Sequence, residues 1–165
     1  MILDIYFRRP VFWDFLTATI ITFILYILYK NSHIALPENQ DSYSLAGDLT
    51  NITLTLSGFI LTILTVLITF KDNTRTNENI DDSNVFNKFF NTKFYYETVR
   101  HLKNCIKSIV TVSAIGFFLK LFLLKEFREY FFFFNSFGLI ITILTIWRCL
   151  LILSKILSFQ KDENG

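Results

Sequence analysis

The sequence contains few of the residues from which catalytic sites are built. Its 165 residues include two histidines and two cysteines, and they form no HExxH, CxxC or GxSxG motif and no phosphate-binding glycine loop. The topology derived below places His33 and His101 on opposite sides of a membrane, so these two side chains cannot share a site. We therefore predict that the protein is not an enzyme and that it holds neither a metal nor another cofactor.

Proline and glycine are also scarce, with two and five residues respectively. Transporters commonly build their substrate sites from broken helices, so this scarcity counts against a transporter. Cys105 and Cys149 fall near the predicted cytoplasmic ends of helices, where a reducing compartment argues against a disulfide. We expect both cysteines to be small packing residues.

Apolar residues, by contrast, are abundant and unevenly distributed. They make up 52% of the chain, with 20 phenylalanines among them. They gather in four blocks, at residues 11–29, 50–70, 105–124 and 131–151. A helix of about 17–25 residues crosses the roughly 30 Å of hydrocarbon in a bilayer. The sequence therefore predicts a single membrane domain over 1–165, all-α, with four transmembrane helices.

The distribution of basic residues predicts the orientation of these helices. Arg8 and Arg9 precede the first block, seven basic residues occur in or just after the loop at 71–104, and Lys155 and Lys161 follow the fourth block. Basic residues favour the cytoplasmic side of a membrane. We therefore expect a multi-pass protein of the cell inner membrane, with both termini and the long loop in the cytoplasm.

The second half of the loop at 71–104 predicts an amphipathic cytoplasmic helix at about 85–103. One face carries aromatic residues and the other carries basic residues; the set that we expect to contact lipid or a partner is Phe86, Phe89, Phe90, Lys93, Phe94, Arg100 and Lys103. Such a helix typically lies on an anionic inner leaflet. It could instead dock a cytosolic protein or a polyanionic signal ligand. Nothing in the loop resembles a nucleic-acid recognition module, so we expect no nucleic-acid partner.

A stripe of small and polar residues runs along the second block. Every third and then fourth position avoids large apolar side chains: Asp48, Asn51, Thr55, Gly58, Thr62, Thr65, Thr69 and Asp72. This spacing averages 3.5 residues, the period of a left-handed coiled coil, so the stripe can face one neighbour over about 36 Å. Small residues allow close helix packing, whereas hydroxyls around an axis line a pore with carboxylates at its two ends. Both interpretations stay open, and the regular run of threonines favours the pore.

The fourth block repeats part of this pattern. The segment GFILTILTV that begins at Gly58 corresponds to GLIITILTI, which begins at Gly138. A second stripe follows at Asn135, Gly138, Thr142, Thr145 and Cys149. Duplication of a helical hairpin explains the repeat, and chance similarity between Ile-, Leu- and Thr-rich helices is the alternative.

Charged residues within the predicted spans are candidates for function. Asp14, one turn into the first span, and Arg148, near the end of the fourth, lie at similar depth. We predict an ion pair between them at the inner interface, with Lys107 as the alternative partner of Asp14. Lys120 and Arg148 could also extend to lipid headgroups.

A short chain with four spans, GFILTILTVL in the second of them and a modest cytoplasmic loop resembles the small membrane subunits of bacterial anti-phage defence systems such as Kiwa and Hailong. The resemblance implies a homo-oligomer, with a tetramer favoured, that perturbs the membrane or opens as a channel when a cytosolic partner signals infection.

Three functions follow as hypotheses. The first is an oligomeric channel or pore that permeabilises the inner membrane as a defence effector. The second is a non-conducting membrane scaffold that recruits a cytosolic partner through the loop at 71–104. The third is a small transporter built from the repeated hairpins.

Overall fold

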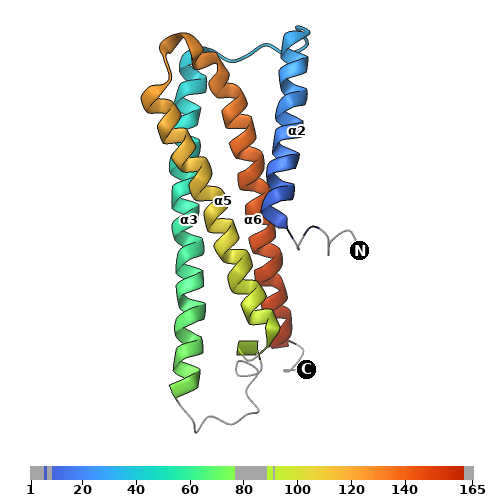
Figure 1. The fold of residues 1–165 in the computed structure, drawn as a ribbon, viewed down its shortest axis with the longest axis vertical. Coiled ribbons are helices and arrows are strands. Elements are labelled where there is room, and N and C mark those ends of the chain that lie inside the picture. The colour runs from blue at the N-terminus through green and yellow to red at the C-terminus, as the bar shows by residue number, and fades with distance from the viewer. Residues whose placement is uncertain (1–5, 7–8, 77–88, 91, 162–165) are drawn as a thin grey trace.

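The computed structural model describes residue 6 and residues 9–76, 89–90 and 92–161. The described chain is helical and contains no strand. Its helices are α2 (Pro10–Lys30), α3 (Asn39–Thr76), α5 (Lys93–Phe122), the 3₁₀ helix η1 (Lys125–Tyr130) and α6 (Phe131–Lys161) (Figure 1). Helices α2, α3, α5 and the η1–α6 segment are each long and apolar enough to cross a membrane. The prediction of an all-α membrane protein with four spans is therefore confirmed.

The helices extend beyond the apolar blocks. The predicted span at 50–70 lies inside α3, which begins at Asn39, and the span at 105–124 lies mostly inside α5, which begins at Lys93. Extending an existing helix by one residue costs far less than starting a new one, so polar flanking residues join the helix next to them. At roughly 1.5 Å per residue, α3 is about 57 Å long, which exceeds the hydrocarbon thickness of a bilayer.

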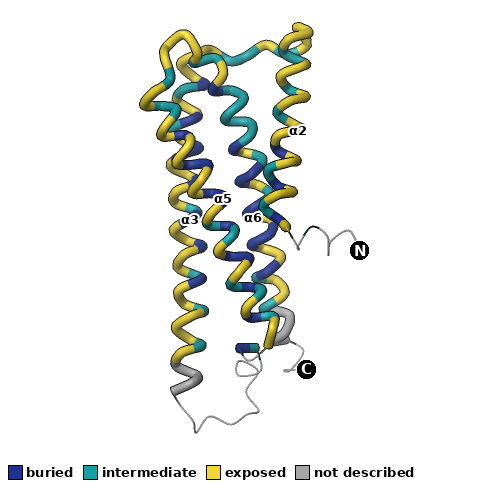
Figure 2. Tube along the Cα trace, viewed as in Figure 1, coloured by how far each residue is buried: buried dark blue, intermediate teal, exposed yellow. Residues whose placement is uncertain are grey.

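Helix α6 forms the centre of the bundle. It contacts α2, α3 and α5, while α3 and α5 pack against each other along most of their length and α2 packs chiefly against α6. Two apolar clusters fill the interior: the first contains Ile60, Leu64, Leu102, Cys105, Ile109 and Cys149, and the second contains Ala18, Val112 and Ile141. Helix α2 is therefore the most peripheral helix, and most of its surface is exposed (Figure 2).

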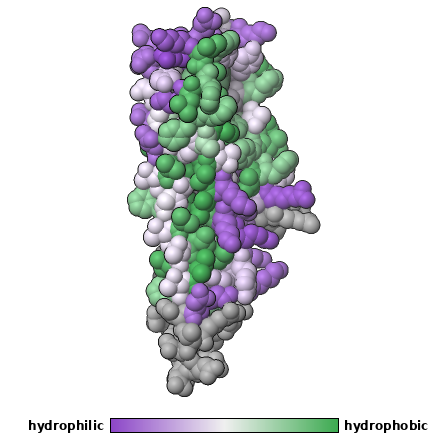
Figure 3. Space-filling view, turned by 60° about the vertical axis from the view of Figure 1, so that its left-hand side comes forward, coloured by the Kyte–Doolittle hydropathy of each residue, from purple (hydrophilic) through white to green (hydrophobic). Residues whose placement is uncertain are grey.

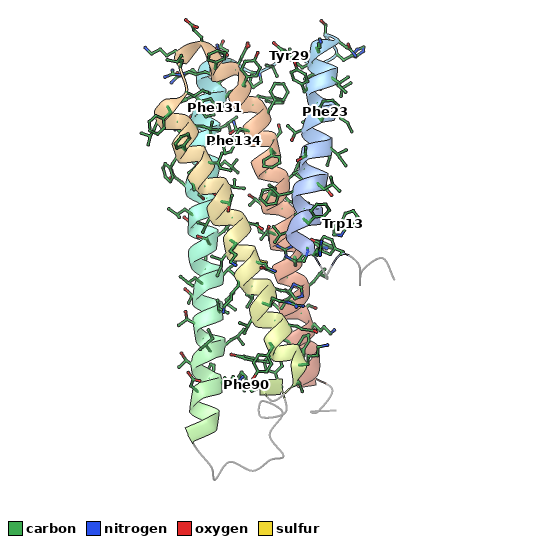
Figure 4. All side chains as sticks on the ribbon, viewed as in Figure 1. Trp13, Phe23, Tyr29, Phe90, Phe131 and Phe134 are labelled. Atoms are coloured by element: carbon green, nitrogen blue, oxygen red, sulfur yellow. The ribbon has the colours of Figure 1, made fainter. Side chains whose placement is uncertain are left out.

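The helices are offset along the bundle axis. All of them meet at the end formed by the α2–α3 connection and η1, which we call the connection end; there the Tyr29 ring packs on Phe133 and the Tyr43 ring on Phe131. Helix α2 begins only about halfway along α3 (Figure 1), so that Trp13 lies near mid-height and Phe90 lies at the opposite end (Figure 4). The other three helices therefore continue well past the start of α2.

The described part of the amphipathic segment predicted at 85–103 does not form a separate surface helix. Residues 93–103 form the first part of α5 and run without a break into the third span. Phe90 is buried and contacts the rings of Phe89 and Tyr95, and the Lys71 ammonium lies 4.3 Å from the centre of the Tyr95 ring. The described aromatic residues Phe89, Phe90 and Tyr95 therefore have partners within the protein, while residues 85–88 and 91 lie outside the described residues.

Candidate functional site

The polar stripe of α3 lies on the side of the helix that is turned away from the bundle. Asp48, Asn51, Thr55, Gly58, Thr62, Thr65, Thr69 and Asp72 are all exposed. The buried residues of α3 follow a different line: Ser42, Ala46, Leu49, Thr50, Thr53, Ser57, Ile60 and Leu64. With 3.6 residues per turn, these two lines fall on nearly opposite faces of one helix. The stripe is therefore not the surface through which α3 packs against its own bundle.

Large apolar side chains border the exposed stripe on both sides. Ile52, Phe59 and Val66 follow one another at heptad spacing along one border, and Leu54, Leu61 and Ile68 do so along the other. Their exposed fractions run from 39% to 65%. The outer face of α3 is thus divided into a narrow polar seam and two apolar flanks. A helix surrounded only by lipid has no need for such a division.

Three of the four threonine hydroxyls of the stripe donate hydrogen bonds to their own helix. Thr55 Oγ1 donates to the Asn51 carbonyl at 2.9 Å, Thr62 Oγ1 to the Gly58 carbonyl at 3.0 Å, and Thr65 Oγ1 to the Leu61 carbonyl at 2.9 Å. Each hydroxyl has only one proton, so what it offers outward is an oxygen lone pair. The threonine part of the seam therefore presents hydrogen-bond acceptors.

The second stripe, on α6, has the opposite environment. Gly138, Thr142, Thr145 and Cys149 are buried and Asn135 is half-buried. A Cβ atom on Gly138 would lie 2.7 Å from Leu49 Cδ2, whereas one on Gly58 would meet nothing within 4 Å. The α6 stripe is thus a packing seam inside the chain. The two halves of the sequence repeat do not occupy equivalent positions.

Asp14 and Arg148, for which the sequence predicts an ion pair, are in contact in the structure. Arg148 Nη1 donates to Asp14 Oδ2 at 2.7 Å, and both side chains are 0% exposed. Two further contacts extend the pair: the Tyr6 hydroxyl donates to Asp14 Oδ1 at 2.6 Å, and Arg148 Nε donates to Cys105 Sγ at 3.3 Å. Burial and the hydrogen bond to Asp14 raise the pKa of Tyr6 above its ordinary value. This cluster ties the start of α2 to α6 and α5.

The ion pair lies near the end of three of the predicted apolar blocks, at Asp14, Cys105 and Arg148, but beside the middle of the block in α3. Cys105, which accepts from Arg148, packs in one cluster with Ile60 and Leu64. These two residues lie in the middle of the apolar stretch of α3 at 50–70. The difference arises because α2 begins halfway along α3, an offset that the separate hydropathy of each helix does not reveal.

The residues predicted to contact lipid or a partner divide into two groups, apart from Phe86, which lies outside the described residues. Phe89, Phe90 and Phe94 are at least partly buried, and the Lys155 ammonium lies 5.0 Å from the centre of the Phe94 ring. The basic residues Lys93, Arg100 and Lys103 are exposed. Among the described residues of this predicted set, the basic ones are therefore the most open to headgroups or a partner.

Some polar contacts inside the bundle were not predicted. Thr53 Oγ1 and Ser113 Oγ are 2.6 Å apart, which joins α3 to α5, and Asn135 Nδ2 donates to the Ser42 carbonyl at 2.8 Å, which joins α6 to α3. Tyr6, the third member of the buried ion-pair cluster, was also missed. The sequence around a single serine, threonine or tyrosine in an apolar segment does not indicate which residue it will bond to.

The described residues contain no group of three or more His, Cys, Asp or Glu side chains that could hold a metal ion. The chain matches no protein-family model, no curated protein and no solved structure.

Proposed function

We propose that the protein is a multi-pass membrane protein whose copies assemble around the polar seam of α3 and conduct cations. The observation that supports this function best is the position of the seam, on the face of α3 opposite the buried face. A packing seam within the chain would have to be covered by α5 or α6, and this one is not. The remaining neighbours for the seam are lipid, water and another copy of the chain.

Lipid is the least favourable of these neighbours. Asn51 is exposed on the seam, and an amide without a hydrogen-bond partner is costly in hydrocarbon. A second copy or water satisfies such a group. The apolar flanks of the seam would then pack between neighbouring α3 helices, much as residues beside a coiled-coil seam do.

The chemistry of the seam favours cations. Three of its four threonine hydroxyls offer acceptor lone pairs, because their protons are bonded to backbone carbonyls. Asp48 and Asp72 place an exposed carboxylate at each end of the seam. Rings of carboxylates attract cations to a pore.

The biological role that we propose comes from the resemblance to small membrane subunits of anti-phage defence systems. In that role the protein is an effector in the bacterial inner membrane, assembled as a homo-oligomer and favoured to be a tetramer. A cytosolic partner or signal ligand would open it. The exposed basic residues Lys93, Arg100 and Lys103 of α5 are available to such a partner.

Cysteine accessibility tests what the seam faces. Thr62→Cys and Leu61→Cys form a matched pair, because the two positions are adjacent and both exposed, with Thr62 in the seam and Leu61 in a flank. A charged, water-soluble thiol reagent is expected to modify Cys at position 62 in membranes and to leave position 61 unmodified. The native cysteines are buried and serve as the background. If the reagent leaves Cys at both positions unmodified, the proposal of a pore is overturned.

Conductance in planar bilayers tests the function directly. Thr62→Phe or Thr65→Phe is expected to reduce cation flux strongly, because a large ring would project into the pathway, whereas Leu61→Phe is expected to change it little. Unchanged flux in the two threonine variants would show that the seam does not line the pathway. Disulfide-linked dimers of the Thr62→Cys protein, with no conductance in any state, would instead identify the seam as a contact between helices of a non-conducting scaffold.

A further inference from the structure

We propose that a cavity between α3 and α6, near the connection end, binds a primary ammonium group carried on an apolar chain. The cavity has a volume of about 290 Å³. Leu45, Ile52, Phe132 and Leu139 contribute apolar walls, and the polar lining residues are Asp48, Asn135 and Ser136. The proposal concerns binding in a single subunit and does not require that the protein conduct ions.

The polar side chains in this cavity offer hydrogen-bond acceptors. The donor groups of Asn135 and Ser136 already bond to backbone carbonyls of the protein. Asn135 Nδ2 donates to the Ser42 carbonyl at 2.8 Å, while its Oδ1 is buried without a hydrogen-bond partner in the described part of the chain. A carbonyl can only accept, so the amide nitrogen must face Ser42, and this fixes the position of Oδ1. The Ser136 hydroxyl donates to the Phe132 carbonyl at 2.9 Å and keeps only its lone pairs.

The Asp48 carboxylate adds negative charge to this set. It is exposed and forms neither an ion pair nor a hydrogen bond with the residues that the structure describes. Two basic side chains at this end lie over the Tyr43 ring: the Lys120 ammonium and the Arg128 guanidinium are both 4.4 Å from its centre, and the Lys120 ammonium also lies against Gly47, the residue before Asp48. Neither forms an ion pair with Asp48 in the described part of the chain. Tyr43 does not line the cavity. The carboxylate is therefore available to a cation from outside the chain.

These features together select the chemistry of the ligand. The lining is mostly apolar, and its few polar groups, the Asp48 carboxylate and the oxygens of Asn135 and Ser136, suit a positively charged donor. Its apolar walls cannot replace the hydration shell of a small metal ion, but they can bury an alkyl chain. An unpartnered carbonyl oxygen such as Asn135 Oδ1 needs an N–H group, which a primary ammonium has and a quaternary ammonium lacks. The fit is thus best for a primary alkylammonium.

The height of the cavity suggests two sources of this group. Asn135 lies in the second turn of α6, close to the connection end, where headgroups would meet the first turns of a membrane-spanning helix. The ammonium could belong to a lipid with an ethanolamine headgroup or to a soluble single-chain amine. Both sources offer the same chemistry to Asp48 and Asn135.

The test uses the full-length protein in phosphatidylcholine nanodiscs. Its thermal midpoint is followed as dodecylammonium is added, because a ligand that binds the folded state raises the midpoint. Dodecyltrimethylammonium keeps the charge and lacks N–H donors, and dodecanol keeps the chain and lacks the charge. The test variant is Asp48→Asn. The matched control is Asp41→Asn, which removes another exposed carboxylate of α3 that does not line the cavity.

We expect dodecylammonium to bind at least about fivefold more tightly than dodecanol, the factor that one partly exposed ion pair provides. It is also expected to bind more tightly than the trimethylammonium probe, which has no N–H group to donate to Asn135 Oδ1. Asp48→Asn is expected to remove the preference over dodecanol and Asp41→Asn to keep it. Equal affinity of the wild type and the Asp48→Asn variant, or equal affinity for the trimethylammonium probe, would overturn the proposal. Competition by phosphatidylethanolamine in the discs would support it with the lipid as source, and unchanged affinity there would support it with the soluble amine. Loss of conduction in the Thr62→Phe variant leaves this binding intact, so the two proposals fail separately.

Discussion

Replacing Arg148 by methionine removes one partner of a buried ion pair and leaves the other in place. Asp14 would stay 0% exposed, with the Tyr6 hydroxyl 2.6 Å from one carboxylate oxygen and no ion pair to another described residue at the other. Removing one partner of a buried pair in soluble proteins costs about 3–5 kcal/mol, because the remaining charge is buried without compensation. We expect Arg148→Met to lower the free energy of unfolding by about that amount, which corresponds to more than about a hundredfold in the equilibrium constant.

A double variant separates the charge from the packing. Asp14→Leu combined with Arg148→Met replaces both charged side chains by apolar ones, and such replacements are often neutral or stabilising. The double variant is therefore expected to be more stable than Arg148→Met alone. Arg100→Met is the control for the loss of an arginine, because Arg100 is exposed on α5.

Both comparisons are made by reversible unfolding of the purified protein in detergent micelles, followed by circular dichroism. If Arg148→Met is no more destabilising than Arg100→Met, the pair does not hold α2 to the bundle. If the double variant is as unstable as Arg148→Met, the loss comes from the shape of the arginine and not from an uncompensated charge.

Two further predictions use the same unfolding measurement. Gly138→Val is expected to cost about 1–3 kcal/mol, because its side chain would overlap Leu49, whereas Gly58→Val, at the corresponding position of the repeat, has open space and is expected to change stability little; equal losses would contradict the assignment of the two environments. Tyr6→Phe removes the hydrogen bond to Asp14, and because the pKa of Tyr6 is raised in the folded protein, the stability advantage of wild type over Tyr6→Phe is expected to be constant below about pH 10 and to decline above it, as the phenol ionises in the unfolded chain. An advantage that grows above that pH would contradict the buried, neutral phenol.

The four spans could be predicted from the sequence because each is a long apolar run, and hydropathy alone identifies such runs. The ends of the helices could not be predicted as well. Helix α3 includes the polar residues at 39–49, and α5 includes the amphipathic residues at 93–103, because helical backbone continues through any residues that tolerate it. The hydropathy of a segment determines where lipid is favourable and not where the helix begins.

The residues that share the polar face of α3 could also be predicted from the sequence, but the environment of that face could not. A spacing of three and four residues identifies one face of α3, and the structure shows all of that face to be exposed. The same spacing on α6 identifies a face that is mostly buried. Periodicity reveals which residues share a face, but the neighbour of that face depends on how the helices are arranged around α6.

The ion pair of Asp14 and Arg148 shows where such reasoning is strong. Two opposite charges in apolar spans have few ways to avoid a large desolvation cost, so their pairing follows from energetics alone. The contact from Arg148 to Cys105 could not be predicted in this way, since a thiol in an apolar helix has no comparable need for a partner.

The offset between α2 and α3 bears on whether one subunit is complete. Arg9 is exposed directly before α2, which begins halfway along α3. If the membrane boundary lies at Arg9, the last turns of α3 and α6 project into water with apolar side chains such as Val66 and Leu150 exposed, although such surface is normally covered by a partner. The surface is consistent with this, because hydrophobic residues continue along the molecule past a hydrophilic patch at mid-height (Figure 3).

If the membrane extends instead to the far end of α3, Arg9 lies at the depth of hydrocarbon without a partner among the described residues, and an unpaired charge there is costly. Each placement thus leaves one group that the described part of a single subunit does not satisfy: apolar surface in water, or a charge in lipid. Additional copies of the chain can cover the first or enclose the second. Because exposed apolar residues of α3 such as Val66 border the polar seam, the proposed contact between copies along this helix would cover this apolar surface and would place the seams of the copies around a common axis.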